Sequence, residues 1–116
     1  MKTHTGGCHC GKVRYEAEAD LSSVIECNCS HCSAKGLLLA FIPKEQFTLL
    51  SDEDALTEYL FNKKVIRHLF CKACGVEPFA FGKDKSGKET VAINVRRIDN
   101  IDLDTITRIP FDGKSL

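Results

Sequence analysis

A mainly β fold is the class that this sequence predicts, and two observations predict it. About seven short runs are rich in β-branched and aromatic residues, and no segment keeps a helical period over three turns. The chain has 116 residues, enough for one domain with one modest core. We therefore expect a single domain over residues 1–116, with only short helical turns.

The expected strands begin with residues 12–19, where small or apolar side chains alternate with charged ones. That alternation is typical of a half-buried strand, whose inward face would carry Val13, Tyr15, Ala17 and Ala19. The run "GLLLAFI" (36–42) is short, continuous and apolar, and the following Pro43 also favours a buried strand. Further strands are expected in residues 46–50, 56–61, 65–70, 78–82 and 90–95.

The connections and the core follow from the same patterns. The polar stretch "KDKSGKE" (83–89) contains Gly87 and is expected to be a hairpin loop. Only residues 43–46 and 99–106 are expected to be briefly helical. Residues 37–42 and 91–95 are the apolar segments that we expect to lie in the core.

The net charge, the N-terminal segment and the length of the apolar runs argue against several classes of partner. Sixteen basic residues balance sixteen acidic ones, so the chain lacks the positive charge expected of a protein that binds nucleic acid. The opening "MKTHTGG" has no apolar core of a secretory signal, and residues 36–42 are too short to span a bilayer. We therefore expect a cytoplasmic protein with no nucleic-acid or membrane partner. The sequence predicts no particular oligomeric state.

The seven cysteines all lie in three clusters, which is the most informative feature of the sequence. The clusters are "CHC", "CNCSHC" and "CKAC", and no cysteine stands outside them. An odd number of thiols in a reducing compartment favours metal binding over disulfides. In C-x-C on an extended chain both sulfurs face the same side, and "CKACG" has the form of a metal-binding turn.

Seven thiols divide naturally into four and three. Combining the two-thiol clusters gives a tetrahedral zinc site that joins distant segments, with Cys8, Cys10, Cys71 and Cys74 as ligands. The remaining Cys27, Cys29 and Cys32 supply three ligands to a second zinc and leave one exchangeable position, as in catalytic zinc sites. Spacing alone also allows Cys27 to pair with either neighbouring cluster. Three ligands hold a metal less firmly than four, so partial occupancy of the second site is expected.

An open three-cysteine zinc site suits the activation of a small thiol. Zinc can hold an added thiol deprotonated at neutral pH, and that thiolate can attack an aldehyde carbon. Three cysteinates leave the site with a net charge of about −1, which weakens the metal as a Lewis acid. Thiol activation and positioning are therefore favoured over strong polarisation of the carbonyl group.

Other polar residues near the clusters are weaker candidates. His31 and His68 could carry a proton, although a solvent-facing or buried structural histidine is the commoner case. A cation near the open site would favour an anionic thiol, and Lys35, Arg96 and Arg97 are the candidates. Ordinary solvated charge is the simpler interpretation of each of these three.

Four segments together resemble the glutathione-dependent formaldehyde-activating enzyme family. They are "GGCHCGKVRYE", "CNCSHC", "RHLFCKACGVEPFAF" and "VAINVRRIDNIDLD", which extend from about Gly6 to Asp104. The resemblance implies a complex fold of several small coiled antiparallel sheets organised around zinc. It implies a structural zinc at Cys8, Cys10, Cys71 and Cys74, and a catalytic zinc at Cys27, Cys29 and Cys32. It also implies a carbon–sulfur lyase activity that joins glutathione and formaldehyde into S-hydroxymethylglutathione.

A second class of function stays open at this point. A zinc-stabilised binding module without chemistry would also use these cysteines, with the fourth ligand of the triplet supplied by His31 or by a partner. A nucleic-acid-binding zinc ribbon is disfavoured by the neutral charge. A thioredoxin-like redox protein is disfavoured because the chain lacks a βαβ pattern.

Overall fold

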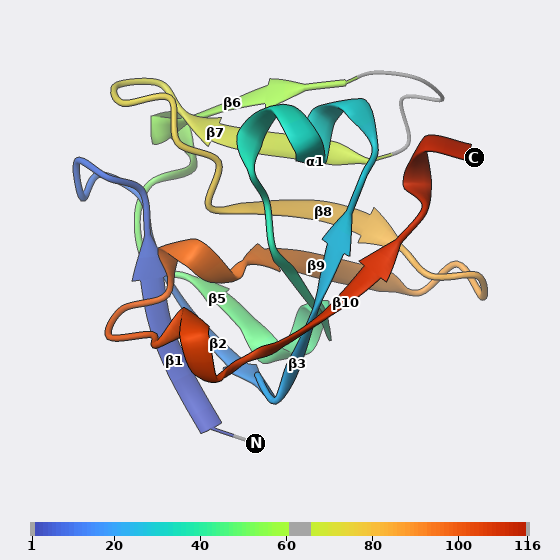
Figure 1. The fold of residues 1–116 in the computed structure, drawn as a ribbon. Coiled ribbons are helices and arrows are strands. Elements are labelled where there is room, and N and C mark those ends of the chain that lie inside the picture. Colours follow the sequence, from blue (N-terminus) through green and yellow to red (C-terminus); the bar gives the residue numbers. More distant parts are fainter. Residues whose placement is uncertain (1, 61–65, 116) are drawn as a thin grey trace.

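The structure, a computed structural model, describes residues 2–60 and 66–115 and consists mainly of strands (Figure 1). One α-helix, α1 (Ser30–Lys35), lies among the described residues. The strands are β1 (Lys2–Gly7), β2 (Arg14–Ala19), β3 (Ser23–Cys27), β4 (Leu39–Pro43), β5 (Phe47–Leu49), β6 (Leu56–Tyr59), β7 (Arg67–Cys71), β8 (Phe79–Lys83), β9 (Glu89–Asn94) and β10 (Thr107–Phe111). Single 3₁₀ turns are η1 (Lys44–Gln46), η2 (Glu53–Ala55), η3 (Val95–Arg97), η4 (Leu103–Thr105) and η5 (Gly113–Ser115).

The strands form two sheets, which confirms the mainly β class. The smaller sheet has the order β1-β2-β5, and the larger has the order β10-β3-β4-β9-β8-β7-β6. Neighbouring strands are antiparallel except β3 and β10, which pair in parallel. A parallel pair needs a long connection, and here residues 28–106 lie between the two strands. The C-terminal strand is thereby placed beside β3 and the turn that follows it (Figure 1).

The strands expected from alternation and apolar runs are found close to their predicted positions. The inward face of β2 is buried as predicted, with Tyr15 fully inaccessible, and Val13, which precedes the strand, is also fully inaccessible. The ends of two predicted strands, Phe61 and Val65, lie outside the described residues. Residues 83–89 form the predicted hairpin between β8 and β9, where the carboxylate of Asp84 accepts from the backbone N–H groups of Ser86 and Lys88.

Three strands and the helix were not expected from the sequence. β1 and β10 are polar or exposed, and β3 is only five residues long, so none has enough apolar alternation to stand out. α1 is six residues long, less than the length over which a helical period can be detected. Phe41 was expected in the core and is 57% exposed, because in β4 only the alternate residues Ala40 and Ile42 face inward.

The core between the two sheets is built around an aromatic cluster. The ring of Phe47 on β5 lies 5.5 Å from that of Tyr15 on β2 and 4.8 Å from that of Phe79 on β8. These contacts attach the smaller sheet to the larger one, and aromatic pairs at such distances add to the free energy of burial. The loop between β1 and β2 is consequently held near the end of β7, where two of the cysteine clusters meet.

Candidate metal centres

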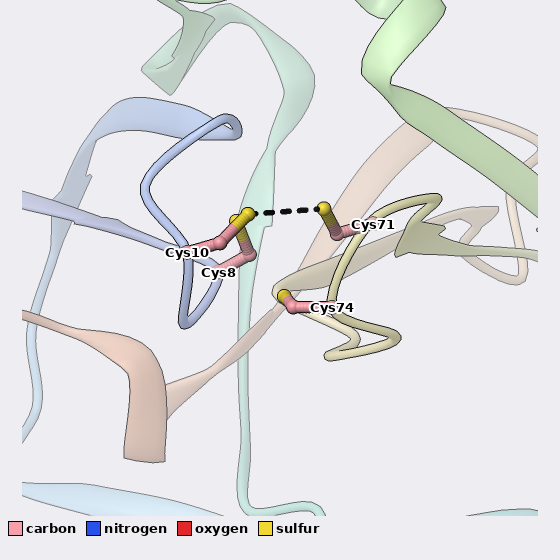
Figure 2. A group of neighbouring side chains, drawn as sticks. All are labelled: Cys8, Cys10, Cys71 and Cys74. Atoms are coloured by element: carbon pink, nitrogen blue, oxygen red, sulfur yellow. Dashed lines mark hydrogen bonds between the residues drawn. The ribbon is translucent and has the colours of Figure 1, made fainter.

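Four cysteine sulfurs from two sheets meet in one group (Figure 2). Cys8 and Cys10 lie in the loop after β1, Cys71 ends β7, and Cys74 lies in the turn that follows. The four Sγ atoms lie within 4.8 Å of one another, and that of Cys10 is 3.6 Å from those of Cys8 and Cys71. A tetrahedral zinc with bonds of about 2.3 Å places its sulfurs about 3.8 Å apart. This donor set therefore fits a zinc-sized thiophilic ion.

The backbone around this four-cysteine group already has the turns that ligation needs. The Sγ atom of Cys8 accepts from the N–H of Val13, and that of Cys71 accepts from the N–H of Ala73. Gly75 follows the second pair with φ of +79°, a left-handed conformation that costs glycine little. Backbone N–H groups directed at sulfur favour the thiolate, which is the form that binds metal.

Two thiols of this group, Cys74 and Cys10, have opposite pKa shifts. Burial acts to raise the pKa of Cys74, but hydrogen bonds from the backbone N–H groups of Val76 and Cys10 outweigh it and lower the pKa to about 6. The backbone at Lys12 acts to lower the pKa of Cys10, yet burial and the neighbouring thiols raise it to about 11. A cation that binds to the group therefore meets a thiolate at Cys74 near neutral pH and must displace the proton of Cys10.

The other three cysteines meet at the junction of β3 and α1. Cys27 is the last residue of β3, Cys29 is the N-cap of α1, and Cys32 lies in its first turn. Their sulfurs also lie within 4.8 Å of one another. The Sγ atom of Cys29 accepts from the N–H of Cys32 at 3.3 Å, as an N-cap oxygen would in other helices. The structure thus groups the seven thiols as four and three, with Cys27 beside Cys29 and Cys32.

Two thiols of this three-cysteine group, Cys29 and Cys32, have opposite pKa shifts. Burial acts to raise the pKa of Cys29, but hydrogen bonds from the N–H of Cys32 and from the neighbouring thiols outweigh it and lower the pKa. Burial raises the pKa of Cys32 well above its usual range. The end of α1 is fixed by Gly36, at φ of +65°, whose N–H is directed at the carbonyl oxygens of Cys32 and Ser33.

A hollow of about 530 Å³ opens beside the three-cysteine group. Arg96, from η3, reaches its rim and donates from Nε to the carbonyl oxygen of Gly36 at 2.8 Å. Phe111, 48% exposed, gives it an apolar wall. The residues that line the hollow are Glu26, Cys27, Asn28, Cys32, Ser33, Gly36, Leu37, Arg96, Pro110, Phe111 and Asp112.

The C-terminal segment forms one side of this site through a residue that the sequence did not single out. Asn28 lies between Cys27 and Cys29, and its backbone N–H donates to the carbonyl oxygen of Phe111 at 3.1 Å. Its side-chain amide donates to Asp112 at 3.0 Å and accepts from the N–H of Lys114 at 2.8 Å. Gly113 is consequently held so close to Cys27 that an added Cβ would lie 2.5 Å from its Sγ atom.

A third cluster is buried behind α1 and contains no cysteine. The carboxylate of Glu77 accepts from Nε2 of His31 at 2.8 Å and from Nζ of Lys35 at 3.0 Å, both on α1. Its second oxygen lies 3.1 Å from Nδ1 of His68 on β7. Burial acts to raise the pKa of Glu77, but these hydrogen bonds, led by that of His68, outweigh it and lower the pKa. Glu77 was missed by the sequence analysis, because a single carboxylate in a loop carries no pattern.

The five weaker candidates thus fall in different places. His31 and His68 lie in the Glu77 cluster, and Lys35 is paired with the same carboxylate rather than facing the hollow. Arg97 donates to the carbonyl oxygens of Gly7 and Cys8, so it stabilises the loop after β1 that carries two cysteines of the four-cysteine group. Arg96 lines the hollow beside the triplet.

The fold and these centres define a class: a small β protein with two thiol-rich candidate metal centres, one of them beside an open hollow. Residues 3–108 match the glutathione-dependent formaldehyde-activating enzyme family, and the chain belongs to that family. A crystal structure of a Rhodobacter sphaeroides protein is similar, with 26% sequence identity and a TM-score of 0.79 over 91% of this chain and 97% of that one. Membership supports a function related to glutathione and formaldehyde. In the part of the chain that the structure describes, no helix is long and apolar enough to cross a membrane.

Proposed function

We propose that this protein is a zinc-dependent carbon–sulfur lyase that joins glutathione and formaldehyde into S-hydroxymethylglutathione. The observation that carries the proposal is the three-cysteine group, which faces a hollow of about 530 Å³ with a cation at its rim. Three thiolate ligands and an accessible side leave a coordination position for a substrate thiol. The family match supports the same pair of substrates.

Two zinc ions are assigned in this proposal. The four-cysteine group would hold a structural zinc, and Cys27, Cys29 and Cys32 would hold the second. A zinc bound by three cysteines supplies a place at which an added thiol stays deprotonated near neutral pH. The protein's own part is to fix the three sulfurs through β3 and α1, and to present Cys29 as the thiol whose pKa is already lowered.

The residues around the hollow fit a small thiol that carries carboxylates. The Nε hydrogen bond to Gly36 fixes the guanidinium of Arg96, whose other N–H groups can donate to a substrate carboxylate. Phe111 offers a surface for the methylene groups of a peptide-like substrate. In the reaction the sulfur bonds to the formaldehyde carbon, the carbonyl π electrons move to oxygen, and the proton lost by the thiol ends on that oxygen.

The alternative is a zinc-stabilised binding module without catalytic activity. The form in which His31 is the fourth ligand of the triplet has less support. If His31 completed the three-cysteine group, one of its ring nitrogens would have to lie beside the three sulfurs, but its donor atom lies with those of His68 and Glu77 instead. Nε2 of His31 lies 2.8 Å from the carboxylate of Glu77, and its ring lies 4.0 Å from that of His68. The histidine is therefore engaged on the side of α1 that faces β7.

Titration of cobalt-substituted protein with glutathione tests the proposal. Glutathione is expected to change the thiolate-to-cobalt absorption of the wild type, and formaldehyde is then expected to exchange with S-hydroxymethylglutathione faster than without protein, as followed by NMR exchange spectroscopy. Cys29→Ser, which removes one ligand of the triplet, should abolish both effects while the protein stays folded. Unchanged spectra at millimolar glutathione would reject glutathione as the substrate.

A further inference from the structure

Glu77 is a buried carboxylate that joins three elements. Its side chain is 2% exposed, and it lies in the segment between the Cys74 turn and β8. Two of its partners, His31 and Lys35, are four residues apart on α1, so they project from the same face of the helix. The third partner, His68, belongs to β7, the strand that ends at Cys71.

This arrangement explains what holds α1 in place. A helix of six residues has too few internal hydrogen bonds to be stable alone, so its position depends on contacts with its surroundings. A buried carboxylate is costly unless donors surround it, and removal of a paired buried charge leaves its partners unsatisfied. Glu77 and α1 therefore stabilise each other, and the hydrogen bonds allow the helix few other orientations.

The same helix carries two thiols of the three-cysteine group. Cys29 caps α1 and Cys32 lies within it, immediately after His31. On the other side, His68 and Glu77 flank the Cys71–Cys74 turn, each three residues from a cysteine of the four-cysteine group. The hydrogen bonds of Glu77 thus link the helix that carries two thiols of one group to the segments that flank two thiols of the other.

We propose that Glu77 is a positioning residue that fixes α1, and with it Cys29 and Cys32, against the strand and turn of the four-cysteine group. This inference rests on the proposed function only where it treats the triplet as a metal site. It has a consequence for metal loading. Metal at the four-cysteine group would order the Cys71–Cys74 turn, which His68 and Glu77 flank in the chain, so the triplet should bind metal more tightly once the first site is filled.

A cation in place of these hydrogen bonds is a weaker interpretation of the cluster. The donor atoms of His31, His68 and Glu77 lie within 4.8 Å of one another, a spacing that would suit a metal ion. However, Nζ of Lys35 lies 3.0 Å from the carboxylate and already supplies a positive charge there. A divalent cation would have to displace or repel that ammonium group.

The test compares Glu77→Gln with Glu58→Gln. Both changes remove a carboxylate that is paired with a cation, but Glu58 is on β6 and pairs with Arg67 near the surface. Cobalt titration in the presence of a competing chelator should show about tenfold weaker binding at the triplet in Glu77→Gln. Binding at the four-cysteine group, assigned from the spectrum of Cys29→Ser, should be unchanged. Adding Lys35→Met to Glu77→Gln should restore part of the loss, because the unpaired charge is removed.

Amide hydrogen exchange, measured after mild chelation has removed zinc from the triplet, gives a readout that does not depend on metal at the triplet. The Ser33 amide donates to the carbonyl oxygen of Cys29 at 2.9 Å. It should exchange faster in Glu77→Gln than in the wild type, and its exchange rate should be unchanged in Glu58→Gln. The inference is overturned if the Ser33 amide exchanges equally in both variants, or if the two metal sites weaken to the same extent. If glutathione leaves the cobalt spectrum of the wild type unchanged, the proposed function is rejected. The hydrogen-exchange result then decides this inference on its own.

Discussion

The two cysteine groups use the same side chain but differ in the sequence separation of their members and in their accessibility. In the four-cysteine group, Cys8 and Cys10 lie in the loop that follows β1 of the smaller sheet. Cys71 and Cys74 lie at the end of β7 and in the turn after it. Cys10 and Cys71, whose sulfurs are in contact, are 61 residues apart in the chain. The three-cysteine group lies within residues 27–32, at the junction of β3 and α1, and adjoins a hollow. Long-range closure suits a stabilising role, whereas a local, accessible group suits exchange with a ligand.

The largest expected difference between the groups is their effect on folding. In the proposed function Cys71 is a ligand of a structural zinc that joins the two sheets, and such sites contribute about 10 kcal/mol to the folding of small domains. We expect Cys71→Ser to give a largely unfolded or aggregating chain and Cys29→Ser to remain folded. Circular dichroism and thermal melts measure the difference. Equal damage by the two variants would contradict the separation into a structural and an exchangeable site.

Metal removal should distinguish the groups next. Gently purified protein is expected to contain between one and two zinc ions per chain by elemental analysis, because three ligands hold the second ion less firmly than four. Mild chelation should remove the triplet's zinc first and leave the circular dichroism spectrum nearly unchanged. Two ions that both resist the chelator would favour a closed module without chemistry.

A smaller effect is expected from a change at Gly113, which lies against Cys27. In Gly113→Ala the new methyl group would lie 2.5 Å from Sγ of Cys27, so the sulfur must move and the triplet should bind cobalt several-fold more weakly. Gly82→Ala is the matched control, because its Cβ would meet atoms only at 3.8 Å or more. The four-cysteine spectrum should be the same in both variants. Equal cobalt affinity at the triplet in the two would show that the C-terminal segment plays no part in the site.

The neighbouring arginines offer the mildest comparison. Arg96 lines the hollow, whereas Arg97 donates to the backbone of the four-cysteine loop. Arg96→Gln is expected to raise the KM for glutathione about tenfold with little change in the melting temperature, since one charge-assisted contact is lost. Arg97→Gln should lower the melting temperature and leave KM unchanged. A higher KM in both variants, or in Arg97→Gln alone, would remove Arg96 from the substrate site.

The sequence predicted most of what depends on local pattern. The alternation in β2 predicted its buried face, and C-x-C and C-x-x-C spacing predicted which thiols lie close together, because both patterns act over a few residues. The helix α1 was missed because six residues are too few to show a helical period, and its hydrogen bonds to Glu77 come from a distant segment. Zinc as the metal and the roles of the two groups remain predictions.

The residues that were missed act through distant contacts. Glu77 is 46 residues from His31, and Asn28 is 84 residues from Asp112, so no window of sequence brings these pairs together. β10 is exposed along its length and is identified as a strand only by its parallel pairing with β3. These contacts surround the three-cysteine group. The thiols of the site could therefore be predicted, but its walls and supports could not.

The comparison of the two groups is tested most directly by ¹¹³Cd NMR of cadmium-substituted protein during a glutathione titration. Cadmium binds the same soft thiolate ligands, and its chemical shift reports the number of coordinating sulfurs. Two resonances are expected, and only the one that Cys29→Ser eliminates should move as glutathione is added. Two resonances that both stay fixed at saturating glutathione, or movement of the four-cysteine resonance, would contradict a closed structural site beside an open exchangeable one.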